Sequence, residues 1–145
     1  MMRQTAAAVE EVCGKEGLQH PSVLGVTVLT SLDGPDLETQ GIAGGVTAQV
    51  VRLAQMAQGA DLAGVVCSAR EVSGIRRACG GSFMLVTPGI RPIGQETGDQ
   101  KRVMTPGDAV RAGIDYIVVG RPITGADDPV QAACLVVREM TEASG

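Results

Sequence analysis

Two arginines and a glutamine stand where a parallel sheet would present them to an anionic ligand. Arg91 follows the third of four apolar runs, and Arg121 follows the fourth, directly after Gly120. Gln100 ends the polar stretch between the two arginines. A guanidinium group can donate two parallel hydrogen bonds to a phosphate and keeps its charge. Glycine lets backbone N–H groups approach an anion closely. These residues indicate a phosphate site, although two solvated loop arginines would give the same pattern.

Other polar side chains have plain structural explanations. Thr30 follows the first apolar run, where it is either a hydrogen-bonding group at the sheet edge or a turn former. The carboxylates Asp33, Asp36 and Glu38 are expected to lie in a loop. His20 precedes a proline, and we expect it to be an exposed loop residue.

Composition excludes several classes of function. The net charge is -4, with 12 basic and 16 acidic residues and no basic block that would suggest nucleic acid. The chain has one Tyr and one Phe, too few aromatic side chains for stacking bases. No apolar run is long enough to span a membrane, and Glu10 and Glu11 interrupt the region where a signal peptide would be apolar. We therefore expect a cytoplasmic protein.

The cysteines predict neither a metal site nor a nucleophile. No CxxC pair is present, and the single histidine cannot complete an ordinary zinc site. Cys67 has no histidine near it in the sequence, which favours a packed thiol. We expect all four to be reduced thiols in or near the core: Cys13, Cys67, Cys79 and Cys134.

The elements that must position these residues alternate along the chain. Apolar runs rich in β-branched residues predict four strands, at 22–30, 64–68, 83–87 and 115–119. The first of them reads as a strand buried on both faces. Helical spacing predicts helices at 5–13, 47–58, 69–79, about 105–112 and about 128–142. The stretch 88–104 is expected to be a long polar loop.

Strands that alternate with helices over short links form a parallel sheet. Four such units are half of a (β/α)8 barrel, whose full length is about 250 residues. A small open α/β sheet fits the same alternation. We expect residues 1–145 to form one domain, since no linker or low-complexity segment divides them.

The strand ends resemble those of the bacterial orotidine 5'-monophosphate decarboxylase family. The resemblance lies in VTPGIRP (86–92), GDQ.R..TP (98–106) and AG.DY.V.GRPIT (112–124), and it extends over essentially the whole chain. It implies the carboxy-terminal half, strands 5–8, of a (β/α)8 TIM barrel. The family is usually dimeric, uses no metal or organic cofactor, and converts orotidine monophosphate to UMP and carbon dioxide in pyrimidine synthesis.

The resemblance also assigns roles for gripping the phosphate of the substrate. Arg121 and Gly120 would bind the phosphate, with help from Arg91 and Gln100. Gln100 would also bridge from the phosphate toward the pyrimidine.

For the base, the resemblance implies that Thr30 hydrogen-bonds the pyrimidine edge and that Pro88 packs against it. It assigns no catalytic residue. The proton donor of the family belongs to an Asp-x-Lys-x-x-Asp run on an earlier strand, and neither Lys15 nor Lys101 lies in such a run. The isolated chain should therefore be inactive.

Three functions remain open at this point. The chain is a decarboxylase fragment, a fragment of a related hexulose-phosphate synthase-like lyase, or a non-catalytic half-barrel that binds phosphate ligands. Its partner is a small nucleotide, not nucleic acid or a membrane. Open strand edges and a bare inner face predict a homo-oligomer, with two half-barrels closing eight strands, or aggregation.

Overall fold

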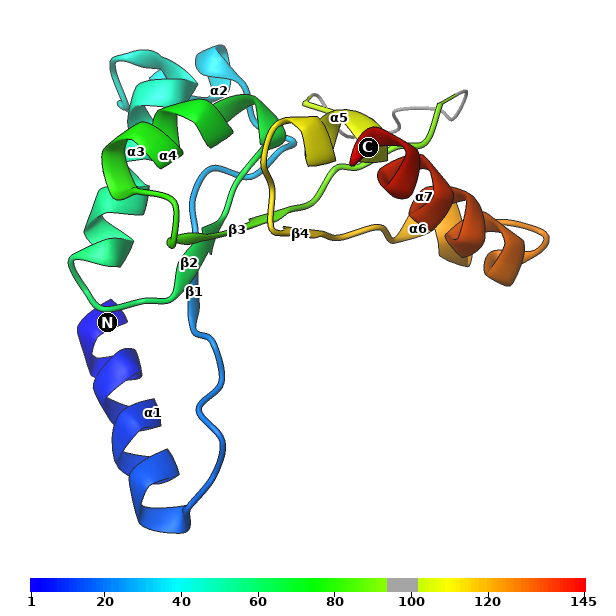
Figure 1. Cartoon of the computed structure of the whole chain (residues 1–145). Helices are drawn as coiled ribbons and strands as arrows, with labels where there is room; N and C mark the ends of the chain where they lie inside the picture. Colours follow the sequence, from blue (N-terminus) through cyan, green and yellow to red (C-terminus); the bar gives the residue numbers. More distant parts are fainter. Residues whose placement is uncertain (94–101) are drawn as a thin grey trace.

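The computed structural model describes residues 1–93 and 102–145 of the chain. Strands and helices alternate in it (Figure 1). The elements are α1 (Met2–Glu16), β1 (Leu24–Val26), α2 (Gly34–Thr39), α3 (Gly45–Gln58), β2 (Gly64–Val66), the 3-10 turn η1 (Ala69–Glu71), α4 (Val72–Cys79), β3 (Met84–Thr87), α5 (Pro106–Arg111), β4 (Tyr116–Ile117), α6 (Arg121–Thr124) and α7 (Pro129–Ala143). None of these helices combines the length and apolar character needed to cross a bilayer.

The four strands form one parallel sheet in the order β1-β2-β3-β4. Its register pairs Val26 with Val66, Val66 with Val86, and Val86 with Tyr116. The predicted strands, their order and their parallel direction are therefore confirmed. Each strand is shorter than its apolar run. Beyond the end of β1, Thr27 N still donates to the carbonyl of Val66, and the chain then turns where Leu32 N donates to the carbonyl of Leu29.

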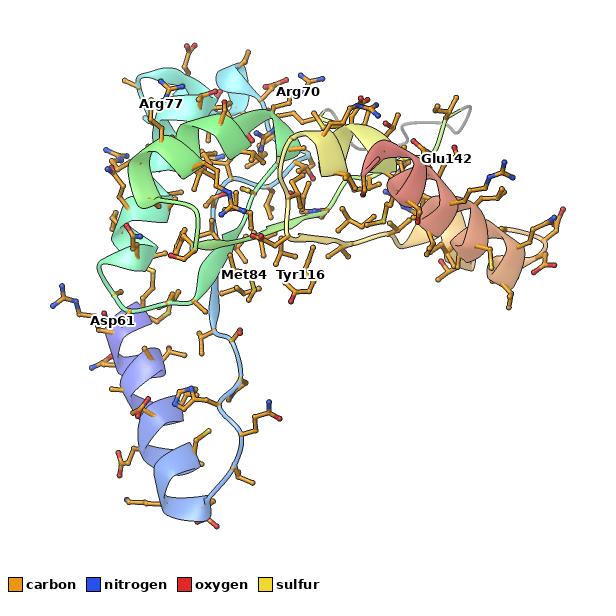
Figure 2. All side chains as sticks on the ribbon, viewed as in Figure 1. Asp61, Arg70, Arg77, Met84, Tyr116 and Glu142 are labelled. Carbon is orange, nitrogen blue, oxygen red and sulfur yellow. The ribbon has the colours of Figure 1, made fainter. Side chains whose placement is uncertain are left out.

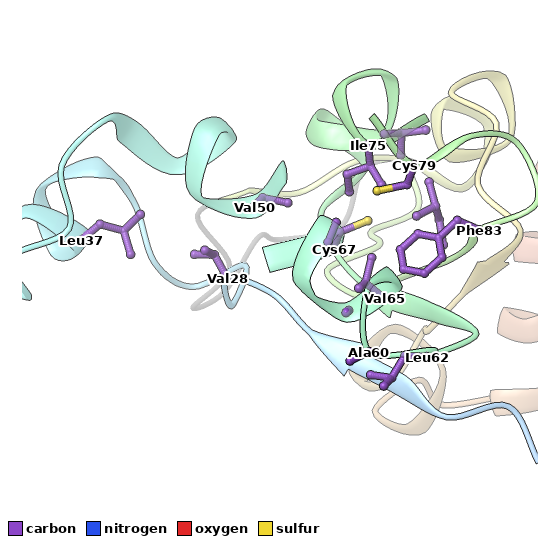
Figure 3. Packing of buried hydrophobic residues seen from close by; sticks show 14 residues of the cluster. Val28, Leu37, Val50, Ala60, Leu62, Val65, Cys67, Ile75, Cys79 and Phe83 are labelled. Carbon is purple, nitrogen blue, oxygen red and sulfur yellow. The ribbon is translucent and has the colours of Figure 1, made fainter. Parts of the chain in front are cut away.

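The buried core lies between the sheet and the helices on one side of it (Figure 1 and Figure 3). Val65 and Leu85 are fully buried on the face of the sheet that meets these helices. Val50 and Ala54 of α3 and Ile75 of α4 are at most 1% exposed and join the same cluster. Burying one aliphatic side chain of this size contributes roughly 1.5–3 kcal/mol. The apolar side chains predicted to share one face of a helix at residues 47–58 lie on the face that packs against this core.

Apolar side chains remain open on the opposite face of the sheet, within the described residues. Val26 is 63% exposed and Tyr116 is 58% exposed. Met84 and Tyr116 point away from α3 and α4 in Figure 2. The prediction that the strand at 22–30 is buried on both faces is therefore wrong for this chain. A parallel strand is buried on both faces only when layers cover both, and here helices pack against one.

Two short helices replace predicted loops. Asp33, Asp36 and Glu38 were expected in a loop, but Asp33 caps α2. The Asp33 side chain accepts from Asp36 N, and the Asp36 side chain accepts from Asp33 N, which forms a reciprocal capping box. The proline after Gly34 stands in the first turn, where it has the backbone angle that a helix needs. The second short helix, α6, begins at Arg121.

The predicted starts of α5 and α7 are confirmed by their side-chain caps. Thr105 accepts a hydrogen bond from Asp108 N at 3.1 Å, and Asp128 accepts one from Gln131 N at 2.9 Å. In the described part of the segment after β3, Ile90 pairs with Met104 in an isolated parallel bridge. That bridge brings the two ends of the segment together beside the sheet.

Candidate functional site

The carboxyl ends of the four parallel strands lie along one edge of the sheet, where α/β folds bind their ligands. Thr30 follows β1, Ser68 follows β2, Pro88 follows β3 and Gly120 follows β4. Thr30 and Ser68 are buried, Pro88 is half-buried and Gly120 is exposed. The predicted residues Thr30, Pro88 and Gly120 therefore come to the same edge from three different strands.

Arg91 lies three residues beyond Pro88, on the segment that follows β3. Its backbone N–H donates to the carbonyl of Met104 at 2.9 Å. Its guanidinium Nη1 donates to the carbonyl of Ile90 at 2.9 Å, and the residue is half-buried. The guanidinium has five N–H donors, so this contact leaves donors that can bind a phosphate.

Gly120 and Arg121 stand at the start of α6, directly beyond β4. The carbonyl of Gly120 accepts from Ile123 N at 2.8 Å and from Thr124 N at 3.1 Å. A Cβ at Gly120 would meet no atom within 4 Å, so packing within the described residues does not require glycine there. Arg121 is exposed. Since β3 and β4 are neighbours, Arg91 and Arg121 leave adjacent strands at the same edge. Gln100, the remaining predicted residue, lies outside the described residues.

A buried ion pair at this edge was not predicted. Arg102 Nη1 lies 2.6 Å from Glu71 Oε1, and the two side chains are only 7% and 3% exposed. Arg102 Nη2 also donates to the carbonyls of Val28 and Leu29 at 3.0 and 3.1 Å. The only sequence signal was the arginine of the GDQ.R string, to which the resemblance assigned no role. Its partner lies 31 residues away in the chain, so local spacing could not identify it.

The thiol of Cys67 lies at the end of β2 and is buried. Burial raises its pKa from an ordinary value of 9.0 to about 12, and the charge of Glu71 adds to the rise. The neighbouring Thr87 side chain and the charges of Arg76 and Arg102 act in the opposite direction. The thiol therefore stays protonated at neutral pH, which agrees with a packed residue and not with a nucleophile.

The other cysteines divide by exposure. Cys13 and Cys79 are buried as expected, but Cys134 is exposed, which corrects its assignment to the core or near-core. Cys134 lies on α7. His20 Nε2 lies 2.7 Å from Glu10 Oε2 and the imidazole is 47% exposed, so this residue is partly exposed and paired. The described residues contain no group of three or more His, Cys, Asp or Glu that could hold a metal ion.

Two hollows lie beside α1, away from the carboxyl edge. One, of about 330 Å³, is lined by Arg3, Glu10, His20, Asp61 and others near the amino ends of β1 and β2. A second lies between the start of α1 and β1 and is mostly apolar. The predicted ligand residues line neither of these two hollows.

Comparison with curated proteins identifies relatives that are longer than this chain. The chain is 54% identical over 124 residues to the "Orotidine 5'-phosphate decarboxylase" of Rhodospirillum rubrum, covering 86% of this chain and 50% of that protein. It is 51% identical over 143 residues to the protein of the same name from Syntrophotalea carbinolica, covering 99% of this chain and 59% of that protein. The chain therefore spans between 50% and 59% of these relatives' length.

Solved structures agree with this relationship. The orotidine 5'-phosphate decarboxylase of Lactobacillus acidophilus matches with a TM-score of 0.70 at 38% identity, over 86% of this chain and 51% of that one. An uncharacterized conserved protein from Geobacillus kaustophilus matches with a TM-score of 0.76 at 32% identity, over 97% of this chain and 58% of that one. The matching family model, described as "Orotidine 5'-phosphate decarboxylase / HUMPS family", covers residues 1–135. The chain belongs to the orotidine 5'-phosphate decarboxylase / HUMPS family.

Proposed function

We propose that this chain supplies strands 5–8 of an orotidine 5'-phosphate decarboxylase barrel and binds the phosphate and pyrimidine of the substrate. The whole enzyme would convert orotidine monophosphate to UMP and carbon dioxide. Two observations support this proposal: the four parallel strands in sequential order, and longer relatives of that name, of which the match covers 50% and 59%. Residues 1–145 would then be one partial barrel domain.

The residues that follow β3 and β4 would bind the phosphate. Barrel enzymes commonly bind phosphate with the loops that follow strands 7 and 8, and these strands correspond to β3 and β4 in the proposed numbering. Arg121 and the backbone at Gly120 would grip the phosphate, and Arg91 and Gln100 would assist. The single observation that carries this assignment of the phosphate site is that Arg91 and Arg121 leave adjacent strands at the carboxyl edge.

Thr30 and Pro88 would bind the pyrimidine, because they follow β1 and β3 at the same edge of the sheet. Thr30 would hydrogen-bond the edge of the base, and Pro88 would pack against its ring. No metal or organic cofactor takes part in this proposal. A nucleotide is then the ligand, and neither nucleic acid nor a membrane is a partner.

Decarboxylation also needs two further groups. One is a carboxylate whose negative charge destabilises the carboxylate of the substrate, and the other is a group that protonates the carbon atom from which carbon dioxide departs. Lys15 cannot be that donor, because it lies on α1 and pairs with Glu11 at 2.5 Å while 68% exposed. Lys101 lies outside the described residues and outside any Asp-x-Lys-x-x-Asp run. The donor would come from strands that this chain does not contain, so the chain alone would be inactive.

The choice of decarboxylase over a hexulose-phosphate synthase-like lyase rests on the relatives. The family description covers both groups, but the relatives at about 50% identity carry the decarboxylase name. A non-catalytic phosphate-binding half-barrel remains the second candidate, since the described strand ends hold arginines but no lysine. The proposed setting is cytoplasmic, with a second copy of the chain as partner.

Titration of the chain with UMP tests the proposed ligand binding directly. The chain should bind UMP, and Arg121→Ala should weaken binding by roughly ten- to a hundredfold, because a hydrogen bond to a charged group contributes about 1.5–3 kcal/mol. Arg91→Ala should have a smaller effect, because Arg121 directly follows Gly120 beyond β4, whereas Arg91 lies on the long segment after β3. Arg138→Ala, at an exposed ion pair on α7, is the control.

Equal losses for Arg91→Ala and Arg121→Ala, or a larger loss for Arg91→Ala, would contradict the ranking. Binding of inorganic phosphate and UMP with equal affinity would favour the non-catalytic phosphate binder, because the base would then add nothing. If the chain does not bind UMP at millimolar concentration, the isolated chain does not form the proposed ligand site.

A further inference from the structure

The buried Arg102–Glu71 pair connects three segments at the carboxyl edge of the sheet. Glu71 ends the 3-10 turn after β2, and Arg102 belongs to the segment after β3. The same guanidinium donates from Nη2 to the carbonyls of Val28 and Leu29, beyond the end of β1. One side chain therefore fixes the relative positions of the residues that follow β1, β2 and β3.

Thr30 is the next residue after Leu29, and it is 6% exposed. Its backbone direction depends on the peptide between Leu29 and Thr30, whose carbonyl oxygen Arg102 holds at 3.1 Å. A planar guanidinium can bind a carboxylate and two carbonyls at once because its donors have fixed directions. Lysine, with a single ammonium group, cannot reproduce that fork.

A contribution to stability does not by itself explain this buried ion pair. Burying two charges carries a desolvation penalty that can match or exceed their attraction. Glu71 Oε2 and Arg102 Nε are buried and have no hydrogen-bond partner among the described residues, so these residues do not fully satisfy the pair. Buried ion pairs of this kind are often better explained by the one arrangement that they specify.

We propose that Arg102 is a positioning residue for the ligand site: by gripping the carbonyls of Val28 and Leu29, it holds Thr30 in the orientation that reaches the pyrimidine. This inference rests on the proposed function, because it assigns Thr30 a ligand to recognise. Arg102 itself touches no ligand in the proposal. Glu71 orients Arg102 and balances its charge.

The first test needs no ligand and measures amide hydrogen exchange on the full chain. In Arg102→Met, exchange at Thr30, Ser31 and Leu32 should rise about tenfold or more, while the amides of α7 keep their protection. Arg138→Met, which removes an exposed arginine from an ion pair with Glu142, is the matched control and should leave all these amides unchanged.

Arg102→Lys guards against a variant that does not fold. It keeps the positive charge beside Glu71 but loses the fork, and it should also raise exchange at Thr30–Leu32. Unchanged exchange at these amides in Arg102→Lys would overturn the proposal. A uniform rise through the whole chain in both variants would also overturn it, because it would show a general contribution to stability.

The second test is a double-mutant cycle on UMP affinity. Thr30→Val should weaken binding by about tenfold in the parent chain, the loss of one hydrogen bond to a buried partner, but by less than about twofold when Arg102 is already lysine. Equal losses in both backgrounds would contradict positioning by Arg102. If the parent chain does not bind UMP, the proposed function fails for the isolated chain, and the exchange result still decides the role of Arg102.

Discussion

At the scale of single residues, Arg91, Arg102 and Arg121 near the carboxyl edge differ in exposure and in partners. Arg102 is buried in contacts with Glu71 and two carbonyls, whereas Arg91 is half-buried and Arg121 is exposed. The exposed and half-buried side chains are therefore suited to meet a ligand, and the buried one is suited to hold the backbone around it.

Cys67 makes a pH-dependent contribution to stability whose sign follows from its pKa. Folding raises that pKa from 9.0 to about 12, so the folded state favours the protonated thiol. The contribution is fully present below pH 9 and is lost as the pH rises toward 12. Above pH 9, the free energy of unfolding should fall by up to about 1.4 kcal/mol per pH unit from this group.

Urea unfolding of the parent and of Cys67→Ser between pH 7 and pH 10.5 measures this effect. Burial also raises the pKa of Cys79, but that residue is present in both proteins and its contribution cancels. The parent should lose stability relative to Cys67→Ser as the pH rises. Parallel pH profiles would show that the Cys67 thiol titrates in the folded chain as it does in water.

At the scale of the elements, close contact between β2 and β3 depends on Gly64. A Cβ at this position would lie 2.1 Å from the carbonyl oxygen of Met84 and 2.5 Å from its Cβ. Backbone atoms cannot move aside as a flexible side chain can, so Gly64→Ala should separate the two strands. We expect a loss of about 1–3 kcal/mol in the free energy of unfolding, the usual cost of overpacking.

Gly14→Ala is the matched control, because Gly14 lies in α1 and a Cβ there would meet no atom within 4 Å. That substitution should be neutral or stabilising by up to about 1 kcal/mol, since alanine favours a helix more than glycine does. Denaturant unfolding compares the two variants. A Gly64→Ala protein as stable as the parent would show that β2 and β3 do not pack as closely as described.

Much of the element pattern could be predicted from sequence, because strands and helices bury side chains with different periods. The short helix α2 was missed because Gly34-Pro35 resembles a turn, although Asp33 and Asp36 at cap spacing are a readable helix start. The exposed face of β1 could not be predicted, since an apolar run reads the same whether or not a second layer covers it. The Arg102–Glu71 pair joins residues far apart in sequence, for which periodicity holds no signal.

At the scale of the whole molecule, the described residues expose apolar surface on the open face of the sheet and on α7. Val26 and Tyr116 are exposed on the open face of the sheet, and Val118 is 50% exposed just beyond β4. On α7, Val130 and Val137 are 74% and 61% exposed and lie seven residues apart, on one face of the helix. Edge strands and open apolar surface of this kind promote pairing with another chain.

Sedimentation at micromolar concentration should therefore detect a dimer or larger species, and not a monomer of 14.8 kDa. Val26→Lys, which places a charge on the open edge strand, should reduce association. Val12→Lys, at a 52% exposed valine on α1, is the control and should have less effect. A compact monomer that unfolds cooperatively would contradict this prediction and would show that the open edges are protected.

Decarboxylation by reconstituted halves tests the central claim most directly. The chain is purified alone and also co-expressed with the amino-terminal half of a related decarboxylase that carries the Asp-x-Lys-x-x-Asp run. We predict no UMP formation from orotidine monophosphate by the chain alone, and measurable formation by the combined halves. Arg121→Ala in this chain should reduce that activity, and so should replacing the lysine in the supplied half. UMP formation by the rigorously purified chain alone, abolished by Arg121→Ala, would contradict the account.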